Sequence, residues 1–596
     1  MADKEIKIAK GGSFLIEPTG SYRIFTADDF TEEQKMIAKT ASDFLEKEIV
    51  PALEKIEHKQ PGLLPSLLKK AGELGLLMVD IPKNYDGLGE SKATSMLVSE
   101  KVHQIGSWAV SIGAHTGIGT LPIIYFGNPE QKKKYLPRLA TGEILSCYCL
   151  TETGSGSDAI SIKTKAVLSP DGKHYILNGG KQFITNAGFA DIFIVYAKID
   201  GDKFSAFIVE KAYSDGILIG AEEKKLGLKG SSTCSITFEN VKVPKENLLG
   251  EVGKGHKIAF NTLNIGRFKL GAGAPGPAKR QLAEAIKYGK VRVQFGKPII
   301  DFGMLRRKVA DMTIKIYAAE SMAYRIAGMM DAGLKAVNED DVAKQMEIIE
   351  EYTIEDSIIK VYGSETMSFV ADESLQMFGG YGFTDEYPAE RPYRDCRVDR
   401  IFEGTNEINR LLIPGTLLRR AGKGQLPLFD FIAKTNSELE EKSKSRIAKT
   451  SGPLAWAVRA CELSKRVALY ASNLAVQKYA LAIQDEQEVM ETMANMIIDI
   501  YAMDSACYRT LQLIEDRGKV KARVQTDITN VLCQESYDRV NLLARTVITA
   551  VAGDEVKKHF KNLEKLGTKG RIDTIKVKKD IAAHTVEADG YNLSAG

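Results

Sequence analysis

The sequence has no excess of charge of one sign. Its 596 residues carry 81 basic and 78 acidic side chains, which leaves a formal net charge of +3. Proteins that hold nucleic acid present a strongly basic face or stripe. We therefore expect no nucleic-acid partner for this chain.

Cysteine and histidine are also sparse. The seven cysteines are an odd number spread over the chain, and the seven histidines are equally scattered. A disulfide framework needs paired cysteines, and a zinc site needs clustered ligands. Cys147 and Cys149 have one residue between them, but no second pair or histidine cluster accompanies them. The sequence predicts reduced thiols and no metal.

The first residues lack the apolar core of a secretory signal. Charges interrupt them, and Asp3 and Glu5 are acids that transit peptides avoid. We expect a cytoplasmic protein. Residues 105–129 carry no charge over 25 positions, which is long enough to cross a membrane. Their several glycines and hydroxyls, together with His115, favour a pair of buried helices instead.

Nucleotide-binding loops are poorly represented. The sequence contains no G-x-x-x-x-G-K-[ST], so nothing supports ATP chemistry. One G-x-G-x-x-G occurs at Gly271, Gly273 and Gly276. A dinucleotide-binding loop follows a strand, whereas a helical pattern precedes these glycines and Pro275 interrupts them. We interpret them as a helix start packed against its neighbours.

What is present is typical of a soluble globular protein. Apolar residues make up 44% and charged residues 27%, and a chain of this length corresponds to about four structural units. Residues 30–146 show helical periodicity, in which Thr31 and Gln34 form a capping box and Pro51 predicts a break. Residues 147–255 hold short β-branched and aromatic runs separated by Asp-Gly turns, and predict an antiparallel β domain.

Helical patterns return after the β domain. Residues 256–420 predict a four-helix bundle. We interpret residues 1–29 as an N-terminal extension, 421–435 as a linker, and 436–596 as a separate C-terminal helical extension. The expected fold class is α+β and mainly α.

Two segments around the β domain combine polar groups with an aromatic ring. Residues 147–158, CYCLTETGSGSD, place hydroxyls and glycines where backbone N–H groups can converge on a polar ring or a phosphate. Residues 181–186, KQFITN, place Phe183 and Thr185 on one side of a strand. Taken alone, each segment also fits an ordinary loop or strand.

A third segment, residues 376–410, contains seven acids and five bases, most of which we expect to pair or to face solvent. Glu403 differs, because it lies between the apolar pair Ile401-Phe402 and Gly404. Burial of its carboxylate would raise its pKa and make it a better base near neutral pH. Local sequence alone favours a solvated glutamate in a charged loop.

In this order, these segments resemble the acyl-CoA dehydrogenase family. The chain carries a TE-x-G-S-G-SD loop, an F-I-T strand, an R-x-x-F-G-K element at residues 292–297, the GGYGF glycines and the FEGTNEINR loop. The likeness spans residues 30–420. The helical addition after it is similar to the very-long-chain branch of the family.

The resemblance implies an activity. Family members bind FAD non-covalently and remove two hydrogens from the α and β carbons of an acyl-CoA during fatty-acid β-oxidation, and an electron-transfer flavoprotein accepts the electrons. Glu403 matches the base that takes the α proton. Its backbone N–H and a ribityl hydroxyl are expected to stabilise the thioester oxygen.

The resemblance also assigns contacts. FAD contacts are expected at Tyr148, Leu150, Thr151, Gly156, Ser157, Phe183, Thr185, Arg292, Phe295, Gln376, Gly380, Thr405 and Glu407. Substrate contacts are expected at Ser157, Arg267, Phe402 and Gly404, with Gly113 and Ala114 on the floor of the acyl pocket. Arg292 matches an arginine that meets the FAD pyrophosphate across a subunit interface, so we expect a homodimer.

Two positions depart from the family pattern. Thr153 stands where proline is usual, which puts the rigidity of the flavin loop in doubt. Phe183 stands where tryptophan is common, and covers a flavin ring with less area.

Some questions stay open on sequence grounds. The small residues at 113–119 fit a long acyl chain and fit close helix packing equally. The nine bases of the tail fit a solvated helix end, which we favour, or a peripheral contact with anionic lipid. These bases are Lys557, Lys558, Lys561, Lys565, Lys569, Arg571, Lys576, Lys578 and Lys579.

Two other functions remain as alternatives. The chain could be an acyl-CoA oxidase, whose reduced flavin reacts with oxygen. It could also be a flavoprotein of low turnover that serves as an assembly or binding partner, although the intact Glu403 argues against this.

Overall fold

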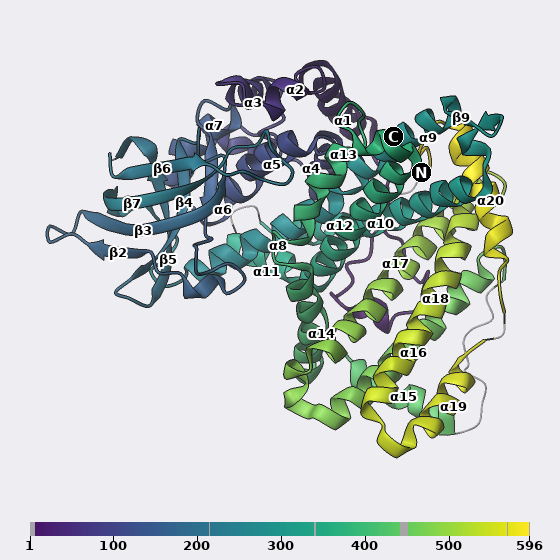
Figure 1. Cartoon of the computed structure of the whole chain (residues 1–596). Helices are drawn as coiled ribbons and strands as arrows, with labels where there is room; N and C mark the ends of the chain where they lie inside the picture. The colour runs from purple at the N-terminus through teal and green to yellow at the C-terminus, as the bar shows by residue number, and fades with distance from the viewer. Residues whose placement is uncertain (1–5, 214, 339–340, 441–450, 569, 595–596) are drawn as a thin grey trace.

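The computed structural model describes residues 6–213, 215–338, 341–440, 451–568 and 570–594. A β-sheet lies at one end, helices of the N-terminal and central regions fill the middle, and a second group of long helices lies at the other end (Figure 1). Residues 1–5, whose charges led us to expect no signal, lie outside the described residues. Lys569 of the basic tail also lies outside them.

The N-terminal region is helical, as the sequence predicts. Thr31 and Gln34 form the capping box of α1 (Glu32–Phe44), with Gln34 N donating to Thr31 Oγ1 at 3.2 Å. A π-helical turn (Leu45–Ile49) and the short α2 (Leu53–Glu57) flank Pro51, so the predicted break is confirmed. The remaining helices are α3 (Leu63–Glu73), α4 (Lys92–Val102), α5 (Gly106–Gly113), α6 (Leu121–Phe126) and α7 (Pro129–Ala140).

The uncharged stretch is a core element. Within the described chain, Gly106–Phe126 is the one segment long and apolar enough to span a membrane, and 67% of its most apolar window is buried inside the protein. It forms α5, a π-helical turn (Ala114–Gly119) and α6. The segment therefore packs against other parts of the chain, as predicted.

The middle domain is a sheet with strand order β6-β7-β3-β2-β4-β5-β8, and β1 pairs with β4. All pairs are antiparallel except β1–β4 and β2–β4, which are parallel because long connections rather than hairpins join these strands. The strands are β1 (Ser146–Cys149), β2 (Lys165–Leu168), β3 (His174–Thr185), β4 (Ile192–Ile199), β5 (Lys203–Glu210), β6 (Ile217–Glu222), β7 (Thr233–Pro244) and β8 (Leu248–Leu249).

The central helices form the bundle that carries the G-x-G-x-x-G glycines. A Cβ on Gly271 would lie 2.7 Å from the Ile359 backbone, and one on Gly276 would lie 2.0 Å from Glu100 O. The glycines therefore allow close helix packing, as interpreted, but only Gly276 lies at a helix start, because Gly271 and Gly273 belong to the last turn of α8. The helices are α8 (Gly255–Gly273), α9 (Pro275–Val291), α10 (Gly303–Lys335), α11 (Val342–Glu351), α12 (Thr353–Phe378), α13 (Glu390–Asp395) and α14 (Asn406–Gly422), and a hairpin of β9 (Val293–Gln294) and β10 (Lys297–Pro298) follows α9.

The predicted linker at residues 421–435 is corrected. Helix α14 continues to Gly422, and α15 (Leu428–Glu440) begins only a few residues later. Leu426 and Leu428 are buried in the main core. The leucines that read as part of a linker therefore attach the chain to the core.

The C-terminal extension is an additional helical domain, as the sequence predicts, but it does not stand apart from the central helices. Its helices are α16 (Ala455–Tyr479), α17 (Gln487–Arg517), α18 (Arg523–Val551), α19 (Val556–Leu566) and α20 (Thr574–Glu587). Residues of α16, α17, α18 and α20 share one apolar core with α10, α12 and α14. An amphipathic pattern shows which face of a helix is buried but not which partner covers it, so the sequence did not predict this shared core.

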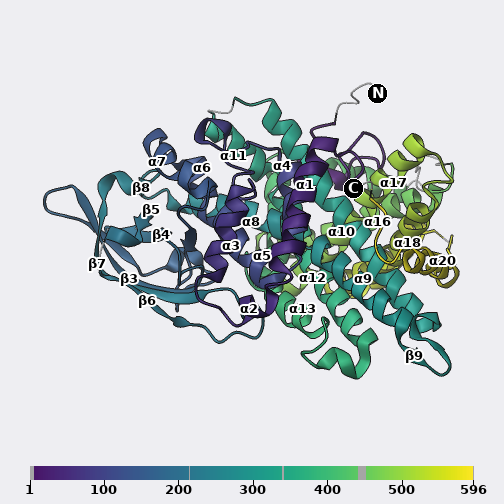
Figure 2. The same cartoon turned by 90° about the horizontal axis from the view of Figure 1, so that it is seen from above.

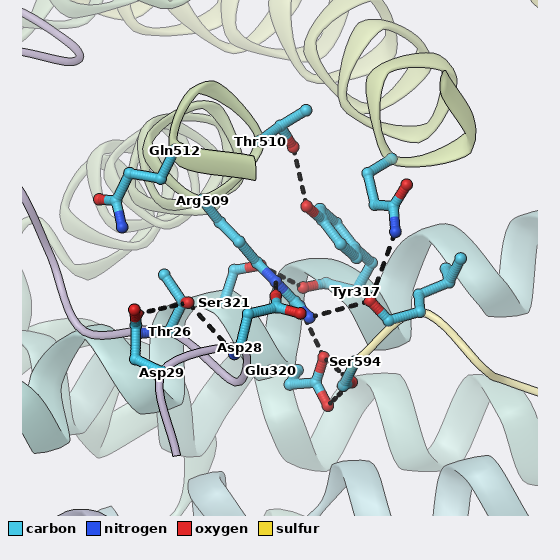
Figure 3. Close-up of polar contacts among 12 residues, drawn as sticks. Thr26, Asp28, Asp29, Tyr317, Glu320, Ser321, Arg509, Thr510, Gln512 and Ser594 are labelled. Carbon is cyan, nitrogen blue, oxygen red and sulfur yellow. Dashed lines mark hydrogen bonds and ion pairs between the residues drawn. The ribbon is translucent and has the colours of Figure 1, made fainter. Parts of the chain in front are cut away.

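The N-terminal extension also belongs to this interface. Phe14 and Leu15 are buried in the shared core, and Thr19 donates to Asp504 of α17 at 2.6 Å. Figure 3 shows Arg509 of α17 bridging Glu320 of α10 (2.6 Å) and Asp28 (3.2 Å). Ser594 near the C-terminus donates to the same glutamate at 2.8 Å. Both ends of the chain are thus tied to the boundary between the two helical groups.

Candidate active site

Two cavities meet at Glu403. The larger, of about 1460 Å³, lies between the β domain, α8 and the loop before α14. It collects twelve of the predicted site residues, namely Tyr148, Leu150, Thr151, Gly156, Ser157, Phe183, Thr185, Arg267, Phe402, Glu403, Gly404 and Thr405. The smaller, of about 480 Å³, shares Thr185, Phe402 and Glu403, and its wall includes Gly113 and Ala114.

The backbone at Glu403 is held in an unusual conformation. Glu403 has φ of 58° and Gly404 has φ of 77°, so two consecutive residues are left-handed. This conformation costs a non-glycine residue of order 1–3 kcal/mol and is kept only where surrounding contacts enforce it. Here Thr405 caps α14 by accepting from Ile408 N at 3.2 Å. Asn409 of that helix donates to Gly404 O at 2.8 Å.

Arg267 holds the same turn from α8. Its Nε donates to the carbonyl oxygen of Glu403 at 3.1 Å, and its Nη1 donates to Asn264 at 2.9 Å. No hydrogen bond engages the backbone N–H of Glu403 anywhere in the described chain. The turn therefore presents a free donor at the cavity junction while its carbonyl is occupied.

Glu403 is half-buried, and one oxygen of its carboxylate is buried without a partner. Its Oε2 makes no hydrogen bond to any described residue. Burial raises the pKa of Glu403 to about 7, against the opposing effect of the Arg267 and Lys360 charges. Such a group can exchange a proton with a bound molecule near neutral pH.

Gly266 of α8 makes room for this carboxylate. A Cβ at position 266 would lie 2.4 Å from Glu403 Oε2 and 2.7 Å from its Cδ. A side chain at position 266 would displace the carboxylate from its present position, so this rotamer of Glu403 depends on the glycine. The sequence does not identify Gly266 as a site residue, because nothing in a helical pattern shows which glycine faces a carboxylate.

Lys360 is a second residue that the sequence analysis missed. It is fully buried in α12 and donates to Gly404 O and to Asn406 Oδ1, both at 2.8 Å. Burial lowers the pKa of Lys360 to about 8. The only signal in the sequence is a lone lysine inside the apolar run SIIKVY.

The loop predicted to contact flavin is anchored by Glu152. Its carboxylate accepts from the buried Lys181 at 2.7 Å, from Thr164 Oγ1 at 2.6 Å and from Lys163 N at 2.6 Å. Gln182 N also donates to Thr151 O at 2.9 Å. These bonds join the loop to the strand that carries Phe183 and Thr185. The rigidity that Thr153 put in doubt is supplied by these contacts of its neighbour.

Replacing Glu152 by Gln should loosen this loop. Burial opposes ionisation of Glu152, but Lys181 and the other donors hold its pKa below the ordinary value, so the residue is charged at neutral pH. The substitution therefore removes an ion pair with Lys181. Breaking a buried pair on one side costs about 3–5 kcal/mol. We expect weaker retention of the group bound in the larger cavity, measured as its dissociation rate on dilution. The double variant Glu152→Gln with Lys181→Met should recover part of the loss, and equal retention in all three proteins would contradict this assignment.

Five predicted contacts lie outside both cavities, namely Arg292, Phe295, Gln376, Gly380 and Glu407. Arg292 lies beside the β9–β10 hairpin, 5.5 Å from the ring of Tyr381, and is exposed. Figure 2 shows this hairpin at the edge of the molecule opposite the sheet. Within one chain, Arg292 therefore does not reach the larger cavity.

Comparison with known proteins agrees with this geometry. Models of the acyl-CoA dehydrogenase N-terminal, middle and C-terminal domains match residues 31–143, 147–241 and 253–418, and a further acyl-CoA dehydrogenase C-terminal model matches residues 463–565. The chain belongs to the acyl-CoA dehydrogenase family.

Three relatives of this acyl-CoA dehydrogenase family member span most of its length. A probable acyl-CoA dehydrogenase of Bacillus subtilis is 46% identical over 100% of both chains. The crystal structure of an acyl-CoA dehydrogenase complexed with FAD from Bacillus anthracis has 47% identity and a TM-score of 0.95, covering 98% of this chain and 100% of that one. The human very long-chain specific acyl-CoA dehydrogenase is 34% identical over 93% of this chain and 86% of its own.

Proposed function

We propose that this chain is an FAD-dependent dehydrogenase of long-chain acyl-CoA thioesters that passes its electrons to an electron-transfer flavoprotein. The observation that carries the proposal is the Glu403 carboxylate, which is buried, unpaired and located where the two cavities meet. Acyl-CoA dehydrogenase activity agrees with the family. The proposal adds to it a preference for long acyl chains and an electron-transfer flavoprotein as the electron acceptor.

The larger cavity suits FAD. Its volume of about 1460 Å³ exceeds the roughly 300–1,000 Å³ of ordinary small-ligand pockets. Phe183 is 63% exposed toward solvent and can cover an aromatic ring, while Thr151, Ser157 and Thr185 supply hydroxyls on the same wall. When bound, FAD supplies the acceptor for the hydride that leaves the β carbon.

The chain's own residues supply the other half of the reaction. Glu403, as the carboxylate, takes the α proton of the thioester. The free N–H of Glu403 can donate to the thioester oxygen and stabilise the negative charge that forms there. Arg267 donates to the carbonyl oxygen of Glu403 and so helps to hold the turn that carries this N–H.

The pH dependence should follow Glu403. Below its pKa of about 7 the carboxyl group is protonated and cannot accept the α proton; above it, the carboxylate can. We therefore expect kcat/KM to rise as pH increases through about 7, which initial rates between pH 5.5 and about 8.5 will measure. A profile that is flat across this range would contradict the assigned pKa.

The smaller cavity supports a long acyl chain. Its wall follows one face of α8 and α9 from Gly266 beside the base to Glu284, at steps of three or four residues. Ala274 between the two helices has helical dihedral angles, so the path is nearly continuous. Eighteen residues correspond to about 27 Å of helix. At its far end the wall becomes polar, with Arg280, Glu284 and Glu386.

Anaerobic titration tests the substrate class. Purified protein should lose its flavin absorbance on addition of palmitoyl-CoA, and less completely with butyryl-CoA. Each methylene that becomes buried contributes about 0.8 kcal/mol, so affinity should increase gradually with length. If butyryl-CoA is the best substrate, the long-chain part of the proposal fails.

The acceptor needs a separate test. A relative named caffeyl-CoA reductase-Etf complex subunit CarC, from Acetobacterium woodii, is 39% identical over 66% of this chain, which supports an electron-transfer flavoprotein as partner. Turnover with palmitoyl-CoA should require added electron-transfer flavoprotein under air. Stoichiometric hydrogen peroxide without it would instead identify an oxidase.

We also propose a homodimer. Arg292 and the 94% exposed Phe295 lie on a projecting element, and Phe383 beside the GGYGF turn is 87% exposed. A second copy would cover these apolar side chains and would bring Arg292 to the partner's cofactor. Sedimentation velocity should show at least a dimer, and Phe295→Asp should shift it toward monomer with loss of FAD.

We propose that the protein is cytoplasmic and that helix α19, and no other part of the basic tail, contacts the membrane surface. Lys557, Lys558, Lys561 and Lys565 are exposed on this helix, whereas α20 lies at the other end of the extension (Figure 1). Lys578 of α20 is paired with Asp311 at 2.6 Å. Replacing the four α19 lysines by Gln should reduce pelleting with anionic vesicles, and equal pelleting would end the proposal.

A further inference from the structure

His103 lies in the wall of the smaller cavity. It directly follows α4, and its ring is placed between α5 and α8. A Cβ on Gly273 of α8 would lie 2.5 Å from Nδ1 of this ring, and a Cβ on Gly113 of α5 would lie 3.6 Å from Nε2. The imidazole therefore occupies the space that two glycines leave open.

The position of the ring along the cavity can be measured on α8. Gly266 marks the level of the Glu403 carboxylate, and Gly273 marks the level of His103. Seven residues separate them, which is two helical turns or about 10 Å. The cavity wall continues beyond this level with Ala274, Pro277 and Gln281. His103 thus lies part-way along the channel and not at its end.

The ring presents an uncharged surface. Burial, assisted by the charge of Lys269, lowers the pKa of His103 to about 4, so the imidazole is neutral at pH 7. The Lys269 ammonium is engaged by Asp80 at 2.6 Å. No hydrogen bond to the His103 ring occurs among the residues that the structure describes. A flat, neutral ring of this kind can lie against a hydrocarbon chain without the larger cost of burying a charge.

We propose that His103 is a specificity-determining residue that sets the width of the acyl channel about two helical turns from the base. Straight chains pass beside the ring, and chains with bulk at this level are disfavoured. The inference rests on the proposed function, because it assumes that the smaller cavity holds the acyl chain.

The test compares three substrates in the holoenzyme. Hexanoyl-CoA ends short of the ring, palmitoyl-CoA passes it as a straight chain, and oleoyl-CoA carries a cis double bond near its middle. In His103→Ala, the ratio of kcat/KM for oleoyl-CoA to that for palmitoyl-CoA should rise about tenfold, because bulk no longer has to be forced into a filled site. The kcat/KM for hexanoyl-CoA should stay within about twofold of wild type.

A second variant acts in the opposite direction. In Gly113→Ala, the added methyl group would stand at ordinary contact distance from the ring, so it fits and narrows the channel. It should lower the oleoyl-to-palmitoyl ratio of kcat/KM, and by a larger factor than it lowers kcat/KM for hexanoyl-CoA. His58→Ala is the matched control, because His58 follows α2 as His103 follows α4 and its exposed ring lies outside the cavity.

The possible failures are distinguishable. If His103→Ala and Gly113→Ala both keep the wild-type oleoyl-to-palmitoyl ratio, with native flavin absorbance and thermal midpoint, the role of His103 is overturned. If no acyl-CoA bleaches the wild-type flavin, the proposed function itself fails.

Discussion

Replacing Glu403 by Gln should remove turnover while leaving a yellow, folded protein. The amide keeps the shape of the carboxylate but cannot accept the α proton, and a positioned base contributes about 10²–10⁴-fold to such a step. Because Oε2 of Glu403 has no partner in the described chain, no hydrogen bond of that oxygen is lost on substitution. The measurement is the rate of flavin bleaching by palmitoyl-CoA in stopped flow.

The matched control is Glu246→Gln, a glutamate that is exposed at the edge of the β domain and outside both cavities. It should keep wild-type rates. An unimpaired Glu403→Gln would remove the base from this account, and loss of bound FAD in that variant would mean that Glu403 has a structural role instead.

Replacing Gly266 by Ala should also cost about 10²-fold, although the change is one methyl group on a helix. The new Cβ would lie 2.4 Å from Glu403 Oε2, a distance that non-bonded atoms do not adopt, so the carboxylate must move. A displacement of about 1 Å at a reacting group can lower the rate by this factor. The expected result is a low kcat for palmitoyl-CoA with FAD retained and the helix intact.

Gly422→Ala is the control for this variant. Gly422 is also helical, but a Cβ there meets nothing within 4 Å, and it ends α14 on the surface. Alanine is the better helix former, so this variant should be as active as wild type and no less stable. If Gly266→Ala retains full activity, the carboxylate has another productive position and the glycine is a packing residue only.

Local patterns predicted the elements that depend on local physics. The capping box at Thr31 and the break at Pro51 follow from side chains within a few residues of each other. The parallel partners of β4 were missed, since pairing depends on residues far away in the chain. Leu426 and Leu428 were assigned to a linker for the same reason, because burial against a distant core is not a local property.

The candidate site divides in a similar way. The motifs identified Glu403, Arg267 and the two flavin segments, since they are runs of residues with a recognisable order. Gly266, Lys360 and Lys181 were not identified, because each matters only through a neighbour that comes from another element.

By itself, the sequence determined the family and the residues of the candidate site segments, because these are written as contiguous residues. Only the tertiary structure decided that Oε2 of Glu403 is unpaired, that burial raises the pKa of this carboxyl group to about 7 and that His103 lines the smaller cavity. These properties arise from burial and from distances between helices that are far apart in the chain, and no local pattern carries that information.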